Sequence, residues 1–380
     1  MHTNEYLFPH RLTRRDFIAT TATALAGLAA APAALAEKKP AVTIGDGNYK
    51  FEAVQDWGAL PPGMKYGFGC GVIVDSKDRV FVTSRSTSPC VAIFDKHGKL
   101  LETWSDQFAE EVGFTTEQVK ETAHCLYWSK EGKNEYIYWT ENVAKPKKND
   151  KDKNKERIGA RVYKTDMRGK ILYEIGNVKE EGSTSQKFDW TNPTDVAIAP
   201  NGDIYVVDGY GSQRVSRFDK NFKHIKTIGE RTKKPQVGKN APSGTFNVCH
   251  GVWIVLHKQK GPEVWIADRH NDRIQIFDME LNHKRNIIDH VRTPCCFYQH
   301  GDVLFVPELA GRVSIYDLDG NLVKHLGDGL LADGKTAKPD NLTNPALFAH
   351  PHAIAVDTRG DFYCVEWVDF GRPRKFKRVV

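Results

Sequence analysis

After its N-terminal region, the chain has no long run of apolar residues. Charged residues make up 27% of the 380 residues. A membrane-spanning helix needs about 20 consecutive apolar residues, so no segment after the N-terminal region is expected to cross a bilayer. The cysteine count is seven, an odd number, so at least one cysteine is expected to be free or to pair with another chain.

The sequence also has little net charge for its length, and its densest basic segment lacks aromatic residues. The formal net charge is +6, and residues 145–157 hold seven basic and three acidic side chains, a net of +4. Surfaces that bind single-stranded nucleic acid combine basic side chains with aromatic ones that stack on the bases. The segment is therefore predicted to be a solvated insertion, and no nucleic-acid partner is expected.

The one apolar stretch that the chain does have lies near its N-terminus and is predicted to be an export signal. Arg14 and Arg15 precede a stretch of small and apolar residues from Ala19 to Ala34, and a small-residue cleavage site ends at Ala36. Paired arginines in this position indicate the twin-arginine route. We expect residues 1–36 to be removed and residues 37–380 to form a periplasmic or secreted protein.

The rest of the sequence repeats a unit of four short apolar runs, seen most clearly in residues 193–229. Each run is bounded by Gly, Pro, Asn or Asp, which indicates short antiparallel strands. Six copies can be aligned, and they begin near Cys70, His124, Thr194, His250, Cys295 and His352. Self-similarity at about 40 residues, with four strands per unit, is typical of propeller blades. The sequence therefore predicts an all-β fold, a six-bladed β-propeller over residues 37–380.

The sixth copy reaches the end of the sequence, Val380, before its fourth strand. The segment from Tyr49 to Gly58, which precedes the first copy, has the pattern of such a strand. We predict that this N-terminal strand completes the last blade and closes the ring. Closure removes exposed strand edges, and no second domain is then needed.

Histidines occupy the first position of the innermost strand in alternate copies, as His124, His250 and His352. Residues on alternate blades are related by about a third of a turn, so these side chains are expected to meet on the ring axis. Each histidine alone is more often structural, but three buried imidazoles without an ion compete for few hydrogen-bond partners. Three histidines with an open fourth position are typical of catalytic zinc. The pattern therefore predicts a Zn²⁺ site.

A second set of residues lies where the second strand of each copy ends. Its members are Arg85, Glu141, Tyr210 beside Gly209, Arg269, Glu308 and Trp367. The end of the second strand lies at the same end of an antiparallel blade as the start of the first strand, so the arginines and Tyr210 are expected to surround the mouth that the histidines line. Arg85 and Arg269 suit a carboxylate, and Tyr210 beside a cation suits a general base. The set predicts a site for a small acid or an acid-terminated substrate.

These motifs resemble those of the NHL-repeat propellers, and among them the peptidyl-α-hydroxyglycine α-amidating lyases. The resemblance covers about residues 42–380. The segment DGYGSQRV, residues 208–215, is similar to the lyase segment with the catalytic tyrosine, and residues 250–277 are similar to the segment with a zinc histidine and a substrate arginine. PHAI, residues 351–354, resembles the last zinc-ligand motif, and AHCL, residues 123–126, matches the first one more weakly.

The resemblance implies a zinc-dependent lyase. It assigns the metal to His124, His250 and His352, proton removal to Tyr210, and the binding of substrate charge to Arg85 and Arg269. The implied reaction cleaves the N–C bond of an α-hydroxy amide, a carbinolamide, and releases an amide and glyoxylate.

The chain departs from the family pattern beside the last ligand. The family has an Asp for a structural calcium directly after its last zinc histidine, whereas this chain has Ala353, and His350 stands where the family has Met. The departure argues against a calcium ion. Two other functions stay open: a propeller hydrolase such as a lactonase, for which Glu141 and Glu308 are the candidate calcium ligands, and a non-catalytic NHL module that binds partners.

Overall fold

The computed structural model describes residues 41–144, 157–330, 344–371 and 373–379. The predicted export signal and residues 145–156 of the basic insertion lie outside the described residues. The helices within the described ranges are all too short or too polar to cross a membrane.

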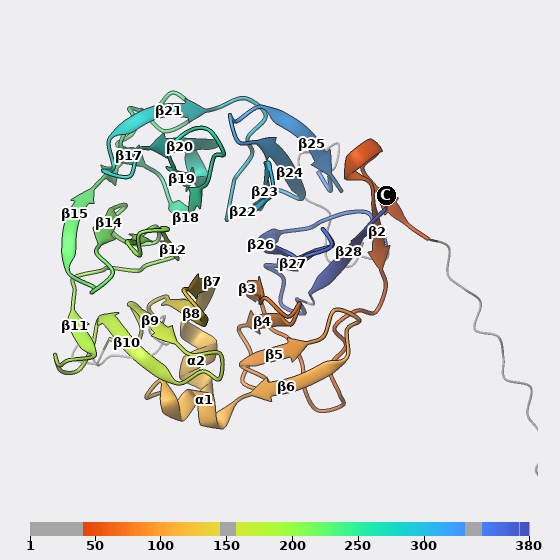
Figure 1. Cartoon of the computed structure of the whole chain (residues 1–380), viewed down its shortest axis with the longest axis horizontal. Helices are drawn as coiled ribbons and strands as arrows, with labels where there is room; N and C mark the ends of the chain where they lie inside the picture. The colour runs from red at the N-terminus through yellow and green to blue at the C-terminus, as the bar shows by residue number, and fades with distance from the viewer. Residues whose placement is uncertain (1–40, 145–156, 331–343, 372, 380) are drawn as a thin grey trace, which may run out of the picture. The chain divides into compact units, whose positions relative to one another are not determined.

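Six sheets form a ring around a central channel, as the repeats predict, and they are antiparallel except for one short parallel pair at the outer edge of the second blade (Figure 1). From the innermost strand outward, the first blade consists of β3 (Gly69–Val74), β4 (Val80–Ser84), β5 (Val91–Phe94) and β6 (Leu100–Trp104). The second blade consists of β7 (Ala123–Glu131), β8 (Asn134–Glu141), β9 (Arg161–Thr165), β10 (Ile171–Gly176) and β11 (Ser185–Lys187). The third blade consists of β12 (Asp195–Ile198), β13 (Ile204–Val207), β14 (Val215–Phe218) and β15 (His224–Ile228). The fold class is therefore confirmed as an all-β propeller.

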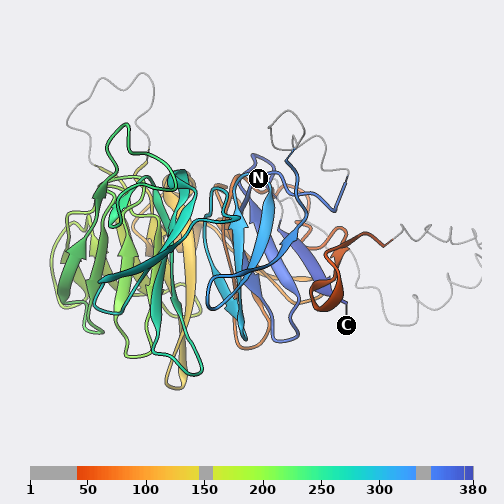
Figure 2. The same cartoon turned by 90° about the horizontal axis from the view of Figure 1, so that it is seen from above.

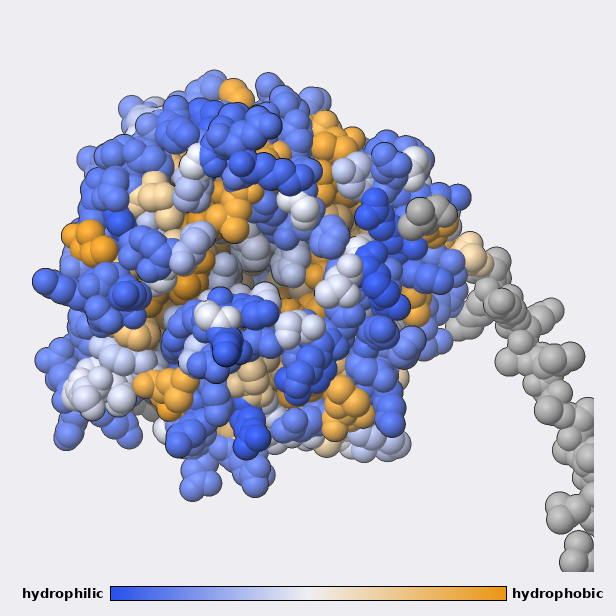
Figure 3. Space-filling view, viewed as in Figure 1, coloured by the Kyte–Doolittle hydropathy of each residue, from blue (hydrophilic) through white to orange (hydrophobic). Residues whose placement is uncertain are grey.

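The other three blades continue the ring. The fourth blade consists of β18 (Cys249–Val255), β19 (Glu263–Asp268), β20 (Arg273–Phe277) and β21 (His283–Ile287). The fifth blade consists of β22 (Tyr298–His300), β23 (Val303–Glu308), β24 (Arg312–Asp317) and β25 (Leu322–Leu326). The sixth blade consists of β26 (Pro351–Val356), β27 (Phe362–Glu366), β28 (Arg374–Arg378), β2 (Phe51–Val54) and β1 (Thr43–Ile44). Viewed from the side, the strands run along the ring axis (Figure 2). A space-filling view of the face in Figure 1 shows a hollow at the centre, with hydrophilic residues over most of the rim (Figure 3).

The last blade combines strands from both ends of the described chain. β2 pairs antiparallel with β28, with Phe51 opposite Arg378 and Val54 opposite Lys375. The Phe51 ring is buried and lies edge-on to Phe362, with 4.8 Å between ring centroids. The N-terminal strand therefore occupies the place that the sequence predicts for it.

Aspartates at the end of the third strand or directly after it build the hairpin turns that follow in five blades. Each carboxylate accepts hydrogen bonds from the backbone N–H groups two and four residues later, as Asp219 does from Asn221 at 2.8 Å and Lys223 at 2.9 Å. The same turn follows Asp95, Asp166, Asp278 and Asp317. An Asp that bonds its own backbone in this way specifies a turn, which explains the recurring Phe-Asp and Tyr-Asp motifs.

A buried ion pair joins the end of the second strand to the start of the third strand in four blades. The pairs are Glu141–Arg161, Asp268–Arg273, Glu308–Arg312 and Glu366–Arg374. Three of the acids also accept backbone N–H groups from the loop that leads into the blade, as Asp268 does from Asn247 at 2.8 Å, and in the second blade Arg161 donates to the Val112 carbonyl instead. Each pair therefore holds a loop at one mouth of the channel.

Loss of the arginine from one pair is expected to destabilise the protein strongly. The side chains of Arg273 and Asp268 are both 0% exposed and lie 2.8 Å apart, so Arg273→Met leaves an uncompensated buried charge. The expected loss is about 3–5 kcal/mol in the free energy of unfolding. Lys258→Met is the control, because Lys258 pairs with Asp302 in solvent, where an ion pair contributes about 0–1 kcal/mol. Denaturant unfolding of both variants measures the difference, and equal losses would contradict the role of the buried pair.

Three further features were not predicted. Two helices, α1 (Asp106–Glu111) and α2 (Thr116–Thr122), lie between the first two blades, and Thr115 and Gln118 form a capping box at α2. A short parallel pair, β16 (Glu230–Arg231) and β17 (Thr245–Phe246), precedes the fourth blade. All seven cysteines lie in the described ranges, and each is buried and free.

Candidate functional site

The three histidines of the alternate blades meet in the channel. The imidazole centroids of His124 and His250 lie 4.9 Å apart, those of His124 and His352 5.1 Å, and those of His250 and His352 4.9 Å. The three side chains form a nearly equilateral triangle, and each residue is at most 1% exposed. One ring nitrogen of each histidine lies within 4.8 Å of the others, a spacing at which one ion can contact all three.

Each imidazole is oriented by a carbonyl of the next blade. Nδ1 lies 2.5 Å from the Thr194 carbonyl in His124, 2.9 Å from that of Cys295 in His250, and 2.8 Å from that of Cys70 in His352. A carbonyl only accepts hydrogen bonds, so Nδ1 carries the proton and Nε2 presents a lone pair. This is the usual arrangement of a metal-binding histidine.

The local backbone explains why these side chains reach the channel. The pairing of the first and second strands shifts by one residue beside each histidine, between Ala123 and Leu126 and between Cys249 and Val252, for example. Such a bulge changes the direction of a side chain. Gly251 follows His250 at a point where a Cβ atom would lie 2.2 Å from the Cys295 carbonyl oxygen. Only glycine fits there, because the neighbouring blade is so close.

The donor atoms fit a divalent ion such as zinc. Nε2 of His124 and Nε2 of His352 are buried and have no hydrogen-bond partner among the described residues. Burial holds the pKa of His124 and His250 well below the usual value and lowers that of His352 to about 3, so the rings are neutral near pH 7. Buried polar atoms without partners are costly, and neutral imidazole nitrogens are zinc ligands.

Tyr210 and Arg269 lie beside this triangle. The Tyr210 hydroxyl is 3.1 Å from Nε2 of His250, to which it donates, and Arg269 donates from Nη1 to the same hydroxyl at 3.3 Å. Burial raises the pKa of Tyr210, and the Arg269 guanidinium opposes part of that rise. The side chains alone therefore keep Tyr210 protonated, and it needs a further positive charge nearby to act as a base.

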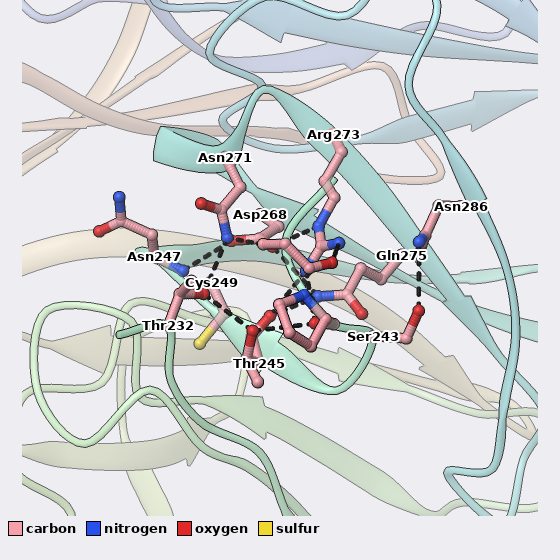
Figure 4. A network of polar contacts seen from close by, with 12 residues as sticks. Thr232, Ser243, Thr245, Asn247, Cys249, Asp268, Asn271, Arg273, Gln275 and Asn286 are labelled. Atoms are coloured by element: carbon pink, nitrogen blue, oxygen red, sulfur yellow. Dashed lines mark hydrogen bonds and ion pairs between the residues drawn. The ribbon is translucent and has the colours of Figure 1, made fainter. Parts of the chain in front are cut away.

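A polar network around Asp268, the residue before Arg269, holds the backbone next to Arg269 (Figure 4). Arg269 begins the short 3₁₀ helix η2 (Arg269–Asn271), directly after Asp268 at the end of β19. The Asp268 carboxylate accepts hydrogen bonds from Arg273 at 2.8 Å and Asn271 at 2.9 Å, and both donors are buried. These hydrogen bonds therefore hold the backbone on both sides of Arg269, while its guanidinium reaches the Tyr210 hydroxyl beside His250.

Arg85 approaches from the opposite side of the site. Its Nη2 donates to Asn142 Oδ1 at 2.8 Å, and its guanidinium lies 5.0 Å from the centroid of the Trp367 ring. That ring is in turn 5.2 Å from the His352 ring. A cavity of about 340 Å³ joins these groups, and its wall consists of Arg85, Asn142, Val143, Asn192, Tyr210, Arg269, Leu309, His352 and Trp367. The cavity wall has two guanidinium groups and no carboxylate.

Glu141 and Glu308, which also end second strands, do not line this cavity. Glu141 binds Arg161 with 2.8 Å between Oε2 and Nε, and Glu308 binds Arg312. Both acids point into their own blades because an arginine of the third strand neutralises them. Asn142 and Asn192, which the sequence did not single out, line the cavity instead. Asn142 directly follows β8 and Asn192 lies in the loop before β12, and neither belongs to a recognisable motif.

Acid is expected to destabilise the metal-free protein. The unfolded chain binds a proton at His352 below about pH 6.5, whereas burial lowers the folded pKa to about 3. The unfolded state then binds more protons, so the free energy of unfolding falls as the pH decreases from about 6.5 toward 3. For this one group the loss is about 2 kcal/mol at pH 5. Urea unfolding in the presence of a chelator at pH 7.5 and at pH 5 measures this loss. The difference in free energy of unfolding between the two pH values should be smaller in His352→Phe. A free energy of unfolding that is the same at both pH values would contradict neutral buried imidazoles.

The comparisons with known proteins agree with the repeat architecture. The NHL repeat family model matches residues 191–218, which include β12, β13 and β14. The chain carries an NHL repeat. This NHL-repeat propeller is similar to a mouse (Mus musculus) NHL repeat-containing protein 3, at 24% identity over 306 residues, or 78% of this chain and 75% of that protein.

The NHL-repeat propeller is also similar to a lyase and to a solved structure. A probable peptidyl-α-hydroxyglycine α-amidating lyase of Caenorhabditis elegans is 34% identical over 122 residues, 32% of this chain and 32% of that protein. The chain thus spans about a third of the length of that curated relative. A protein of unknown function from Bacteroides thetaiotaomicron shares the fold, with a TM-score of 0.53 at 14% identity over 88% of this chain and 75% of that one.

Proposed function

We propose that this protein is a zinc-dependent lyase that cleaves the C–N bond of an α-hydroxy amide with a terminal carboxylate. The observation that carries the proposal is the set of three imidazoles whose Nε2 atoms converge beside Tyr210 and Arg269. The partial similarity to an amidating lyase supports the same reaction class.

The charge of the cavity supports a small anionic substrate. Arg85 and Arg269 reach it, the wall contains no acid, and a bound divalent ion would add further positive charge. A carboxylate neutralises a guanidinium through paired hydrogen bonds. The volume of about 340 Å³ is near the lower end of ligand pockets, so it suits the α-hydroxyglycine end of a molecule better than a large substrate.

Each side chain has a defined task in the proposed reaction. A zinc ion bound by His124, His250 and His352 would polarise the substrate hydroxyl and lower its pKa. Tyr210 accepts the hydroxyl proton in its phenolate form and becomes a neutral phenol; the positive charge of the ion and the Arg269 guanidinium, 3.3 Å from the phenol oxygen, would favour that phenolate. The carbonyl group of glyoxylate forms as the C–N bond breaks, the nitrogen leaves with the bonding electron pair, and it takes up a proton to become the amide.

The test is glyoxylate release from an N-acyl-α-hydroxyglycine by the purified, zinc-loaded protein. The corresponding N-acyl glycine, which lacks the hydroxyl, is the control and should not react. Release that depends on both the hydroxyl and zinc supports the lyase. A lactone that is hydrolysed while the hydroxyglycine is not would favour the hydrolase, and metal-free protein without activity would favour a binding module.

We further propose that the protein works outside the cytoplasm after export by the twin-arginine route. The proposal rests on Arg14 and Arg15 and on the small-residue site that ends at Ala36. The route carries folded proteins, so the metal can be loaded before export. Sequencing the N-terminus of the exported protein tests it, with Glu37 as the expected first residue.

A further inference from the structure

A second group of metal-ligating side chains lies in the channel, one residue further along the chain from the histidine register. Its members are Cys125, which follows His124; Asp195, which follows Thr194; and Cys296, which follows Cys295. They come from the second, third and fifth blades, and the inner strands of these blades surround the channel (Figure 1). This group is distinct from the three histidines and shares no residue with them.

The three donor atoms are close enough to bind one ion. The Cys125 and Cys296 sulfurs and one Asp195 oxygen all lie within 4.8 Å of one another. The two sulfurs are 3.6 Å apart. Two thiolates bound to tetrahedral zinc at about 2.3 Å lie about 3.8 Å from each other, whereas a disulfide needs about 2.05 Å. The observed spacing therefore matches a pair of metal ligands.

The carboxylate is oriented and lacks a counter-charge. Asp195 accepts backbone hydrogen bonds from Val196 at 2.9 Å on Oδ1 and from Val252 at 3.1 Å on Oδ2, so each oxygen keeps a further lone pair. The residue is 6% exposed, and none of the ion pairs among the described residues includes it. A buried carboxylate is normally paired with a cation or bound to a metal. Two thiols next to it do not supply positive charge.

We propose that Cys125, Asp195 and Cys296 bind a second divalent ion of intermediate softness, with zinc as the best fit. Two thiolates and one carboxylate carry three negative charges, which more than offset the two positive charges of such an ion, and sulfur ligands disfavour the hard ions calcium and magnesium. The proposal does not depend on the lyase activity or on the three-histidine site.

The fourth coordination position of this ion faces a different cavity from the one that Arg269 lines. The three ligands line a cavity of about 750 Å³ that extends to the turns between first and second strands, at Gly132, Gly202 and Gly301. Those turns lie at the far end of the inner strands from the histidines. The second ion therefore joins three blades across the channel and leaves one coordination position open to a water or a small ligand from the opposite mouth.

Cobalt replacement of zinc in the purified full chain tests the proposal. A cobalt ion bound by cysteine gives a thiolate-to-cobalt charge-transfer absorption in the near ultraviolet, which a three-histidine site does not give. We expect this band in the wild type and in His250→Ala, and its loss in Cys296→Ser together with one fewer metal ion per chain. Cys364→Ser is the matched control, because Cys364 is a buried cysteine of β27 that is not one of the three ligands, and it should keep the band.

Two results would overturn the proposal. One is a wild-type cobalt spectrum without the sulfur band. The other is a count of five rather than seven free thiols in the denatured wild type, which would assign Cys125 and Cys296 to a disulfide. If Cys296→Ser fails to fold, Asp195→Asn replaces it, since the amide keeps the size of the side chain and removes its charge. The wild-type spectrum decides the presence of a sulfur-bound ion without any variant, whether or not glyoxylate is released.

Discussion

Tyr210→Phe is expected to lower kcat for glyoxylate release by about 10²–10⁴-fold, the usual contribution of a general base. The hydroxyl is the only group that the substitution removes, and it lies 3.1 Å from Nε2 of His250 and 3.3 Å from Nη1 of Arg269. Phenylalanine does not carry a proton from the substrate hydroxyl, but it fills the same space. The metal content should therefore stay at the wild-type value, and KM should change much less than kcat.

The control for this variant lies in the same blade. The Tyr205 hydroxyl donates to the Met279 carbonyl at 2.7 Å, away from the histidines, so Tyr205→Phe removes a buried phenol hydroxyl without touching the site. Steady-state kinetics and metal analysis of both variants separate catalysis from folding. Wild-type kcat in Tyr210→Phe would remove Tyr210 from the mechanism and leave its hydrogen bonds as structural contacts.

The repeat made the histidine cluster predictable from the sequence. Every blade places equivalent residues at the same height in the channel, so alignment of the copies is enough to bring His124, His250 and His352 together. The Gly, Pro, Asn and Asp residues that bound each apolar run likewise made the positions of the strands predictable. Helices α1 and α2 belong to no copy of the repeat, and the direction of Glu141 depends on Arg161, a partner 20 residues away in the sequence.

The second group of ligands shows where strand periodicity fails. In a regular strand, successive side chains point to opposite faces, so a residue after a channel-facing histidine is expected to leave the channel. In β7 the pairing shifts between Ala123 and Leu126, and His124 and Cys125 both contribute to groups in the channel. A bulge has no reliable sequence signal, and only the packed ring reveals that Cys296 of the fifth blade lies 3.6 Å away from Cys125.

His250→Ala is expected to remove one metal ion per chain and to reduce glyoxylate release by more than Tyr210→Phe does. Two imidazoles, those of His124 and His352, would remain, fewer than the three protein ligands of a catalytic zinc site. Without the ion, the substrate hydroxyl keeps the high pKa of an alcohol, and Tyr210 loses the positive charge that offsets the effect of burial on its own pKa. One substitution therefore makes the substrate hydroxyl a weaker acid and Tyr210 less able to accept its proton.

The matched control for His250→Ala is a histidine at the other end of the same blade. His257 lies next to Glu263, with 3.2 Å between Nε2 and Oε2, and its side chain is 6% exposed. His257→Ala thus removes an equally large, enclosed imidazole and should leave both metal content and glyoxylate release near the wild-type values. Elemental analysis with kinetics of the two variants distinguishes a ligand from a packing residue. Equal metal content in both would mean that the channel histidines hold no ion, because a three-ligand site does not keep its affinity after losing one donor.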